Sequence, residues 1–214
     1  MRAGVLHTVP ALVPVFHGLL TGRRDDLDIV HVADPSLLAR AVASGITDDV
    51  VSDIRGHLDG LRATGARAVL VTCSSIGEAA AEAARSVGLT LVRVDAAMAA
   101  TAVERARSGS GRVLVLATLP ATLGPTSRLV GAAASGTEVD VTAHVVEGAA
   151  AARSAGDQQR HDALIADAIR EASGLDVIVL AQASMAPGAG DDPRVLTSPE
   201  SGAEAFVAAL RSEP

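Results

Sequence analysis

Two stretches of this chain lie 110 residues apart and resemble each other, and a repeat of that length limits the folds the chain can adopt. Val5–Ala11 aligns with Val115–Ala121, and five of the seven aligned residues are identical. The same shift aligns Val69–Ser74 with Val179–Ser184, with three identities in six positions. Repeats of this kind indicate that one structural unit has been duplicated within the chain.

A third similarity, at a shift of 113, pairs His31–Asp34 with His144–Glu147. The three similarities occur in the same order along the chain, and each lies at the end of an aliphatic run. The sequence therefore predicts two related units of about 110 residues each. The second alignment places Cys73 opposite Ala183.

Short aliphatic runs alternate with Ala-rich stretches that have helical character. The predicted strands are Ala3–Leu6, Leu27–Val32, Ala68–Val71, Leu89–Val94, Arg112–Ala117, Val139–Val145 and Val177–Ala181. The predicted helices are Asp48–Thr64, Gly77–Val87, Ala96–Ser108, Gln158–Ser173 and a final one at Ser201–Arg211. Strand–helix alternation of this kind is typical of parallel sheets with both faces covered.

The predicted fold is α/β, with two pseudo-symmetric lobes that are each a parallel sheet flanked by helices. We expect the first lobe to comprise residues 1–95 and 200–214, and the second to comprise residues 96–199. The last helix would then return to the first lobe. Sites in such folds lie beyond the carboxyl ends of the strands, so we expect an active-site cleft between the two lobes.

Composition narrows the possible functions. Two Phe, no Trp, no Tyr and a net charge of −7 argue against a nucleic-acid partner. The single cysteine excludes an internal disulfide and a cysteine-based zinc cluster, and no other spacing predicts a metal site. No glycine-rich nucleotide loop is present, so we expect no cofactor. No apolar run is long enough for a membrane span and no signal peptide is recognised, so we expect a cytoplasmic protein.

Cys73 is the main candidate for chemistry, because it lies between a strand and a helix start in a polar turn. Ser74 or Ser75 could cap that helix. A thiol at a helix amino terminus has a lowered pKa, which favours a thiolate base or nucleophile. A buried, inert cysteine is the alternative. The polar neighbours, including Thr72, favour a functional cysteine.

Other candidates also follow predicted strands or begin helices. Thr118 and Thr122 follow a strong strand, and their hydroxyls could hold a carboxylate, as could Thr8 in the first half. His7 ends the first strand and His161 starts a helix. Each of these two histidines could have either a structural or a catalytic role.

The segments Thr72–Ser75, Ala117–Thr122 and Leu180–Met185, together with the repeat, resemble the aspartate/glutamate racemase superfamily. That group includes glutamate, aspartate and hydantoin racemases, maleate isomerase and arylmalonate decarboxylase. The resemblance implies cofactor-independent chemistry on a small carboxylic acid. It also implies one catalytic cysteine from each lobe, on opposite faces of the substrate's α-carbon. Cys73 matches the first position, whereas the second falls on Ala183.

We expect a cofactor-independent isomerase or racemase-like enzyme that acts on a small carboxylic acid through Cys73, with a lyase and a binding protein as the two alternatives. Cys73 could work with His161 or a bound water as an isomerase or epimerase. It could instead act alone in a lyase, protonating an enolate after decarboxylation. The chain could also be a non-catalytic protein that binds small acids.

The expected catalytic residues are Cys73 and His161. The expected substrate-binding residues are His7, Thr8, Ser74, Ser75, Thr118, Thr122, Gln182 and Ser184. We further expect a homo-oligomer, a dimer or larger.

Overall fold

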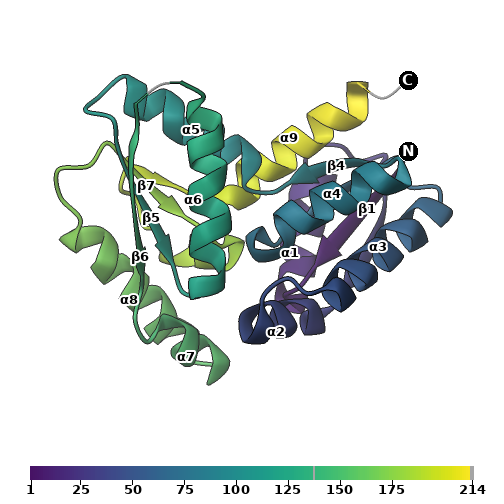
Figure 1. Ribbon diagram of the computed structural model, residues 1–214, viewed down its shortest axis with the longest axis horizontal. Helices are drawn as coiled ribbons and strands as arrows, with labels where there is room; N and C mark the ends of the chain where they lie inside the picture. Colours follow the sequence, from purple (N-terminus) through teal and green to yellow (C-terminus); the bar gives the residue numbers. More distant parts are fainter. Residues whose placement is uncertain (137, 213–214) are drawn as a thin grey trace. The chain divides into compact units, whose positions relative to one another are not determined.

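The computed structural model describes residues 1–136 and 138–212, which form two compact α/β units (Figure 1). The first unit comprises Met1–Val94 and the described residues from Pro199 onward, and the second comprises Asp95–Ser198. Among the described residues, no helix combines the length and apolar character that a membrane span requires.

The first unit contains a four-stranded parallel sheet in the order β2-β1-β3-β4. Its strands are β1 (Arg2–His7), β2 (Asp28–Ala33), β3 (Ala68–Val71) and β4 (Thr90–Arg93). All four residues of β3 are buried, as expected for a central strand covered on both faces.

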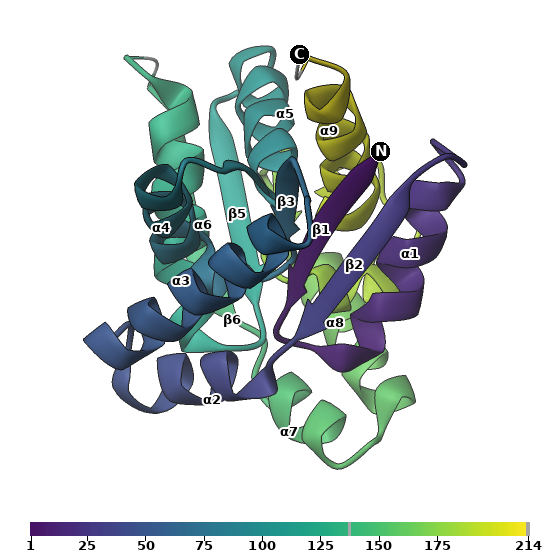
Figure 2. The same ribbon diagram turned by 90° about the vertical axis from the view of Figure 1, so that its right-hand side faces the viewer.

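Helices cover both faces of this sheet (Figure 2). One face carries α2 (Pro35–Ser44), α3 (Asp48–Ala63) and α4 (Gly77–Val87), and the other carries α1 (Val13–Thr21) and α9 (Ser198–Ser212). Two short 3-10 turns, η1 (Pro10–Leu12) and η2 (Ser74–Ile76), follow β1 and β3. The two phenylalanines, Phe16 in α1 and Phe206 in α9, are fully buried.

The second unit repeats this plan with a parallel sheet in the order β6-β5-β7-β8. Its strands are β5 (Arg112–Ala117), β6 (Asp140–Val145), β7 (Val177–Leu180) and β8 (Val195–Leu196). One core cluster joins α5 (Ala96–Arg107) and α6 (Pro120–Ala134) to the sheet. The other joins α7 (Ala149–Ser154), α8 (Gln158–Glu171) and η3 (Ala183–Gly188) to the opposite face.

The predicted fold class is confirmed, because both units are parallel sheets flanked by helices and have the same strand order. The seven predicted strands are present with ends shifted by a residue or so. The sequence did not predict α1, α2, α6, α7 or β8. The elements α7 and β8 are too short to show a clear period. The helices α1, α2 and α6 each have a proline among their first two residues, which makes their start hard to recognise.

The backbone hydrogen bonds correct the alignment of the second repeat by one residue. The Thr72 N–H donates to the Leu6 carbonyl, at 3.0 Å between N and O. In the second unit the Ala181 N–H donates to the Leu116 carbonyl, at 2.9 Å. Since Leu6 and Leu116 are equivalent in the repeat, Thr72 corresponds to Ala181. Cys73 therefore corresponds to Gln182, and its predicted pairing with Ala183 is wrong.

The third similarity is also one residue out of register. Val5 pairs with His31, and the equivalent Val115 pairs with Ala143 rather than His144. Because side chains alternate along a strand, His31 and His144 lie on opposite faces of their sheets. The matching His-Val letters are therefore a coincidence of sequence.

The helix α9 approaches the end of β4 too closely for a side chain at Gly202. A Cβ added there would lie 2.5 Å from the carbonyl oxygen of Val94. Glycine therefore permits the contact that seats α9 on the first unit.

Candidate active site

Cys73 lies two residues beyond the carboxyl end of β3 and precedes η2, which leads into α4. Its side chain is 9 % exposed. The serines do not cap the helix as predicted, because Ser74 and Ser75 lie inside η2. The N-cap of α4 is Ile76, and no side chain makes the capping hydrogen bond.

Four groups around the Cys73 thiol act to lower its pKa and so favour its thiolate. They are the Thr8 hydroxyl, the backbone N–H groups of Ile76 and Ser75, and the Ser75 hydroxyl. Burial has the larger effect, however, and raises the pKa of the Cys73 thiol above its ordinary value. The predicted lowering of this pKa is therefore wrong, because the loss of solvent outweighs the donors at the turn.

A thiol with a raised pKa is mainly protonated at neutral pH. It can donate a proton to a carbon that becomes negatively charged during a reaction. The four hydrogen-bond donors then stabilise the thiolate that is left behind. The surroundings of Cys73 are thus suited to a thiol that starts as an acid.

In the second unit, Gln182 occupies the position that Cys73 has in the first. Its side-chain Oε1 accepts hydrogen bonds from the Thr118 backbone N–H at 2.6 Å and from the Thr118 hydroxyl at 3.0 Å. Two predicted site residues are thereby brought together. An amide does not ionise near neutral pH, so Gln182 cannot take the part of a second catalytic thiol.

Two other predicted residues of the second unit are also buried near its strand ends. Thr122 lies in the first turn of α6, where its backbone N–H donates to the Leu119 carbonyl. Ser184 lies in η3, and its carbonyl accepts a hydrogen bond from Arg153 Nη1 at 3.3 Å. Burial of a positively charged side chain lowers the pKa of Arg153.

His161 is fully buried in α8. Its Nδ1 donates to the Ala149 carbonyl at 2.9 Å, which fixes the ring orientation. Among the described residues, this Nε2 has no hydrogen-bond partner.

His7 is fully buried at the end of β1, and both of its ring nitrogens are already in use. Nδ1 lies 2.9 Å from the Thr72 hydroxyl, and Nε2 lies 3.0 Å from Nδ1 of His31. Burial and the nearby His31 lower the pKa of His7 to about 4. This ring has no free nitrogen for the substrate contact that the sequence suggested.

His31 in β2 continues the contact outward, because its Nε2 lies 3.2 Å from Nδ1 of the exposed His17 in α1. Sequence reasoning did not select Thr72, His31 or His17 for any site. A signal was available for His31, because His7 and His31 occupy odd positions of β1 and β2, which share one face of the sheet.

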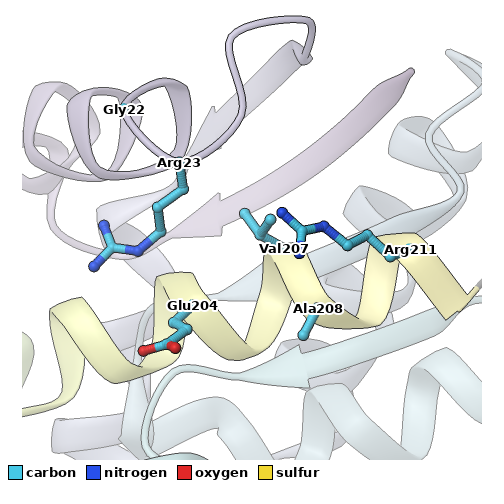
Figure 3. A pocket seen from close by; sticks show the side chains of 6 residues that line it. All are labelled: Gly22, Arg23, Glu204, Val207, Ala208 and Arg211. Atoms are coloured by element: carbon cyan, nitrogen blue, oxygen red, sulfur yellow. The ribbon is translucent and has the colours of Figure 1, made fainter.

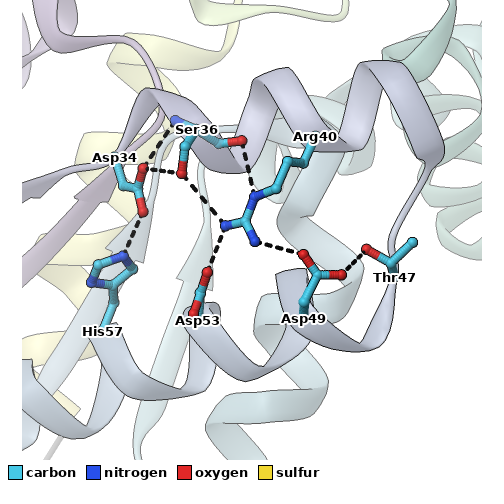
Figure 4. A network of polar contacts seen from close by, with 7 residues as sticks. All are labelled: Asp34, Ser36, Arg40, Thr47, Asp49, Asp53 and His57. Carbon is cyan, nitrogen blue, oxygen red and sulfur yellow. Dashed lines mark hydrogen bonds and ion pairs between the residues drawn. The ribbon is translucent and has the colours of Figure 1, made fainter.

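A separate polar network stabilises the surface of the first unit (Figure 4). Asp34 caps α2 by accepting from the Ser36 N–H at 2.9 Å and contacts His57 Nε2 at 2.8 Å. Arg40 bridges Asp49 at 2.7 Å and Asp53 at 2.6 Å. These charges are satisfied by one another, so we assign the network to stability.

Each unit contains a cavity lined by residues outside the predicted site. One, of about 590 Å³, is lined by Gly22, Arg23, Glu204, Val207, Ala208 and Arg211 (Figure 3). Its Arg23 is already paired with Glu200. The other, of about 530 Å³, lies in the second unit between α8 and the β5–β6 edge and contains His144 and Glu171. Neither includes a residue of the predicted site.

Residues 10–206 match a family described as Asp/Glu/Hydantoin racemase. A search of curated proteins finds no match to this sequence. Among solved structures, a glutamate racemase from Bacillus anthracis is similar, with a TM-score of 0.70 and 15% identity. The match covers 98% of this chain and 81% of that one.

Two further structures extend the range of chemistry among these neighbours. An aspartate racemase from Picrophilus torridus has a TM-score of 0.65 and 15% identity, covering 98% of this chain and 94% of that one. A mutant of arylmalonate decarboxylase has a TM-score of 0.58 and 21% identity, covering 99% and 92%. At sequence identities this low, the structural matches show a shared fold.

Proposed function

The chain belongs to the Asp/Glu/Hydantoin racemase family, and on that basis we propose that it moves protons at the α-carbon of a small carboxylic acid through Cys73 alone. Membership of this family makes it an enzyme of the isomerase or related lyase kind. The proposed reaction uses no cofactor. The observation that carries the proposal is the setting of the Cys73 thiol, which is buried, protonated and surrounded by donors.

The proposed reaction is that of a lyase, in which a carboxylate leaves the α-carbon as carbon dioxide. The electron pair of the broken C–C bond passes into the remaining carboxyl group as an enediolate. The Cys73 S–H then gives its proton to the α-carbon, and a solvent proton later restores the thiol. A raised thiol pKa supports this order, since the thiol must carry its proton when the C–C bond breaks.

The proposed ligands for the substrate's carboxylate are neutral donors. In the first unit they are the hydroxyls of Thr8, Ser74 and Ser75, which lie at or beside the turn that holds Cys73. In the second unit we propose Thr118, Thr122, Gln182 and Ser184. Hydroxyl and amide groups can bind a carboxylate without supplying a proton to carbon.

An isomerase is the second candidate, and His161 favours it. Racemisation needs a base on one face of the α-carbon and an acid on the other. Nε2 of His161 has no hydrogen-bond partner among the described residues, and in a neutral ring with Nδ1 donating it could act as that base. In this case Cys73 would supply the returning proton.

The proposal is tested by turnover on a defined panel. It comprises phenylmalonate, both enantiomers of glutamate and aspartate, maleate and a 5-substituted hydantoin, assayed by carbon dioxide release and chiral chromatography. We expect turnover of a malonate-type acid, and a loss of about 10²–10⁴-fold in Cys73→Ala. Thermal shift should show that Cys73→Ala still binds the same acid.

Two results would contradict the proposal. Turnover that survives Cys73→Ala would remove the thiol from the mechanism. Tight binding of an acid with no turnover of any panel member would show a binding protein instead. His57→Gln, which changes a residue of the surface network, is the matched control and should keep full activity.

A further inference from the structure

We propose that His17, His31 and His7 form a proton relay between the solvent and the carboxyl end of β3, where Thr72 and Cys73 lie. The relay would return a proton to this end of the sheet after each turnover. Its purpose rests on the proposed function, whereas its existence can be tested without any substrate.

The relay consists of three contacts in series within the first unit. The exposed His17 contacts His31 at 3.2 Å, His31 contacts His7 at 3.0 Å, and His7 contacts the Thr72 hydroxyl at 2.9 Å. His7 and His31 each use Nδ1 toward the inner neighbour and Nε2 toward the outer neighbour. His17 contacts His31 through Nδ1. The series thus passes from an exposed side chain to one that is only 4 % exposed.

The hydrogen-bonding rules allow only two arrangements of an uncharged series. A neutral imidazole has one N–H donor and one acceptor nitrogen. If the Thr72 hydroxyl accepts, all three rings carry their proton on Nδ1. If it donates, all three carry it on Nε2. Transfer of one proton along the series converts the first arrangement into the second, with every donor and acceptor still matched.

Proton balance in this step is complete. A solvent proton binds Nε2 of His17. His17 passes its Nδ1 proton to His31, and His31 passes its own Nδ1 proton to His7. In the proposed step the Thr72 hydroxyl receives a proton from His7. It gives up its own proton to the Cys73 thiolate that turnover leaves, which restores the thiol. Rotation of the rings, or the reverse transfer, resets the series.

Burial and neighbouring rings keep the two inner rings, His7 and His31, neutral at rest. Burial and His31 lower the pKa of His7 to about 4, and burial and His17 lower that of His31. At pH 7, about one molecule in a thousand would therefore carry a charged His7. A proton can pass through such a ring but does not remain there.

No carboxylate among the described residues bonds to any of these rings. From β2, Asp34 gives only its backbone N–H to the His7 carbonyl, because its carboxylate is held by Ser36 and by His57 of α3. From α9, Glu200 is paired with Arg23. From β3 the facing group is the Thr72 hydroxyl, and from α1 Phe16 lies against His7.

A metal site is a poorer explanation of the same histidines. The contacts are two separate nitrogen pairs, with His31 giving one nitrogen to each. Within residues 1–136 and 138–212, no group of three or more His, Cys, Asp or Glu side chains could hold a metal ion.

The test is nuclear magnetic resonance of the ¹⁵N-labelled full-length chain, with no ligand added. Long-range ¹H–¹⁵N spectra report the tautomer of each histidine, and saturation transfer from water reports how fast the His7 ring proton exchanges. We expect His7, His31 and His17 to share one tautomer at neutral pH. We also expect the buried His7 proton to exchange at least tenfold more slowly in His17→Gln, because an amide does not relay protons.

The controls distinguish a proton relay from hydrogen bonds that only stabilise the packing of β1, β2 and α1. Gln at position 17 can still hydrogen bond to His31, so a purely structural contact would leave exchange unchanged. Thr72→Val removes the inner end and should leave exchange from the outer end intact. His57→Gln lies outside the series and should leave His7 exchange as in the wild-type chain.

Three outcomes would overturn the relay. They are mixed tautomers among the three rings, unchanged or faster His7 exchange in His17→Gln, and micromolar binding of Zn²⁺ that shifts all three rings. Each can occur while Cys73-dependent turnover persists. Conversely, a relay seen in the spectra would stand even if no acid of the panel were turned over.

Discussion

Thr118 donates both its backbone N–H and its hydroxyl to the side-chain carbonyl of Gln182, at 2.6 Å and 3.0 Å. In the first unit, the hydroxyl of the equivalent Thr8 acts to lower the pKa of the equivalent Cys73. The duplicated fold has thus kept a threonine beside the residue that follows the third strand of each sheet. Only one of the two units has a group there that can carry a proton to carbon.

The first prediction concerns a variant in which a thiol is added to the second unit. Gln182→Cys places a thiol at the position equivalent to Cys73, beside the Thr118 hydroxyl. We expect this variant to exchange the α-proton of a bound amino acid and to racemise it slowly. Chiral chromatography of single enantiomers of glutamate and aspartate measures the effect.

The matched control is Ala183→Cys, one residue further along. Its side chain lies on the next position of the turn, so we expect no racemisation from it. Equal activity in the two variants would show that the hydrogen-bond register does not identify the equivalent position.

The second prediction concerns the pKa of Cys73. Because the Thr8 hydroxyl lowers this pKa, Thr8→Val should raise it further. The rate of alkylation by iodoacetamide, measured from pH 6 to pH 11, should then fall about tenfold at neutral pH. Thr118→Val, the equivalent change in the second unit, is the control. A faster reaction in Thr8→Val would mean that the Thr8 hydroxyl does not lower the pKa of Cys73.

The fold was largely predictable from the sequence, because buried parallel strands have a strong aliphatic signal. The central runs Ala68–Val71 and Arg112–Ala117 were predicted to the residue. The alignment of the two halves was harder. Identities at Val179 and Leu180 favoured a register that the hydrogen bond from Ala181 shows to be one residue out.

The sequence indicated the polar turn that holds Cys73 but not the electrostatics around the thiol. The turn at Cys73 indicated hydrogen-bond donors, and donors are present there. The sequence could not show that burial would outweigh them, since this depends on packing from α2, α3 and α4 around the thiol. Nor could it show that Thr72 and His31 would occupy both nitrogens of His7.

The third prediction concerns acid stability. The folded chain holds the pKa of His7 at about 4, against 6.5 when the ring is exposed. As pH falls through this interval, the unfolded chain takes up a proton that the folded chain does not. Stability present above pH 6.5 is therefore lost down to pH 4, by about 3 kcal/mol.

Urea unfolding at several pH values measures this loss. His7→Gln should be less stable at pH 7, but its stability should fall less between pH 6.5 and pH 4 than that of the wild-type chain. Equal slopes in the two proteins would show that His7 is not the group responsible.

The fourth prediction compares two helical glycines. A Cβ at Gly202 would lie 2.5 Å from the Val94 backbone oxygen, whereas one at Gly56 in α3 would meet nothing within 4 Å. We expect Gly202→Ala to destabilise the chain by about 1–3 kcal/mol. Gly56→Ala should stabilise it by about 0.5–1 kcal/mol, because alanine favours the helix. Thermal unfolding of both variants decides whether α9 needs glycine at this contact.

The most direct test of one-sided proton transfer is the stereochemistry of product formed in deuterated water. A malonate-type acid turned over by the native chain should give a product with one deuteron at the α-carbon and a single configuration, because only Cys73 supplies a proton to carbon. Cys73→Ala should give no such product. A racemic product formed at the full rate of the native chain would contradict the account, because it would require a second proton donor on the opposite face.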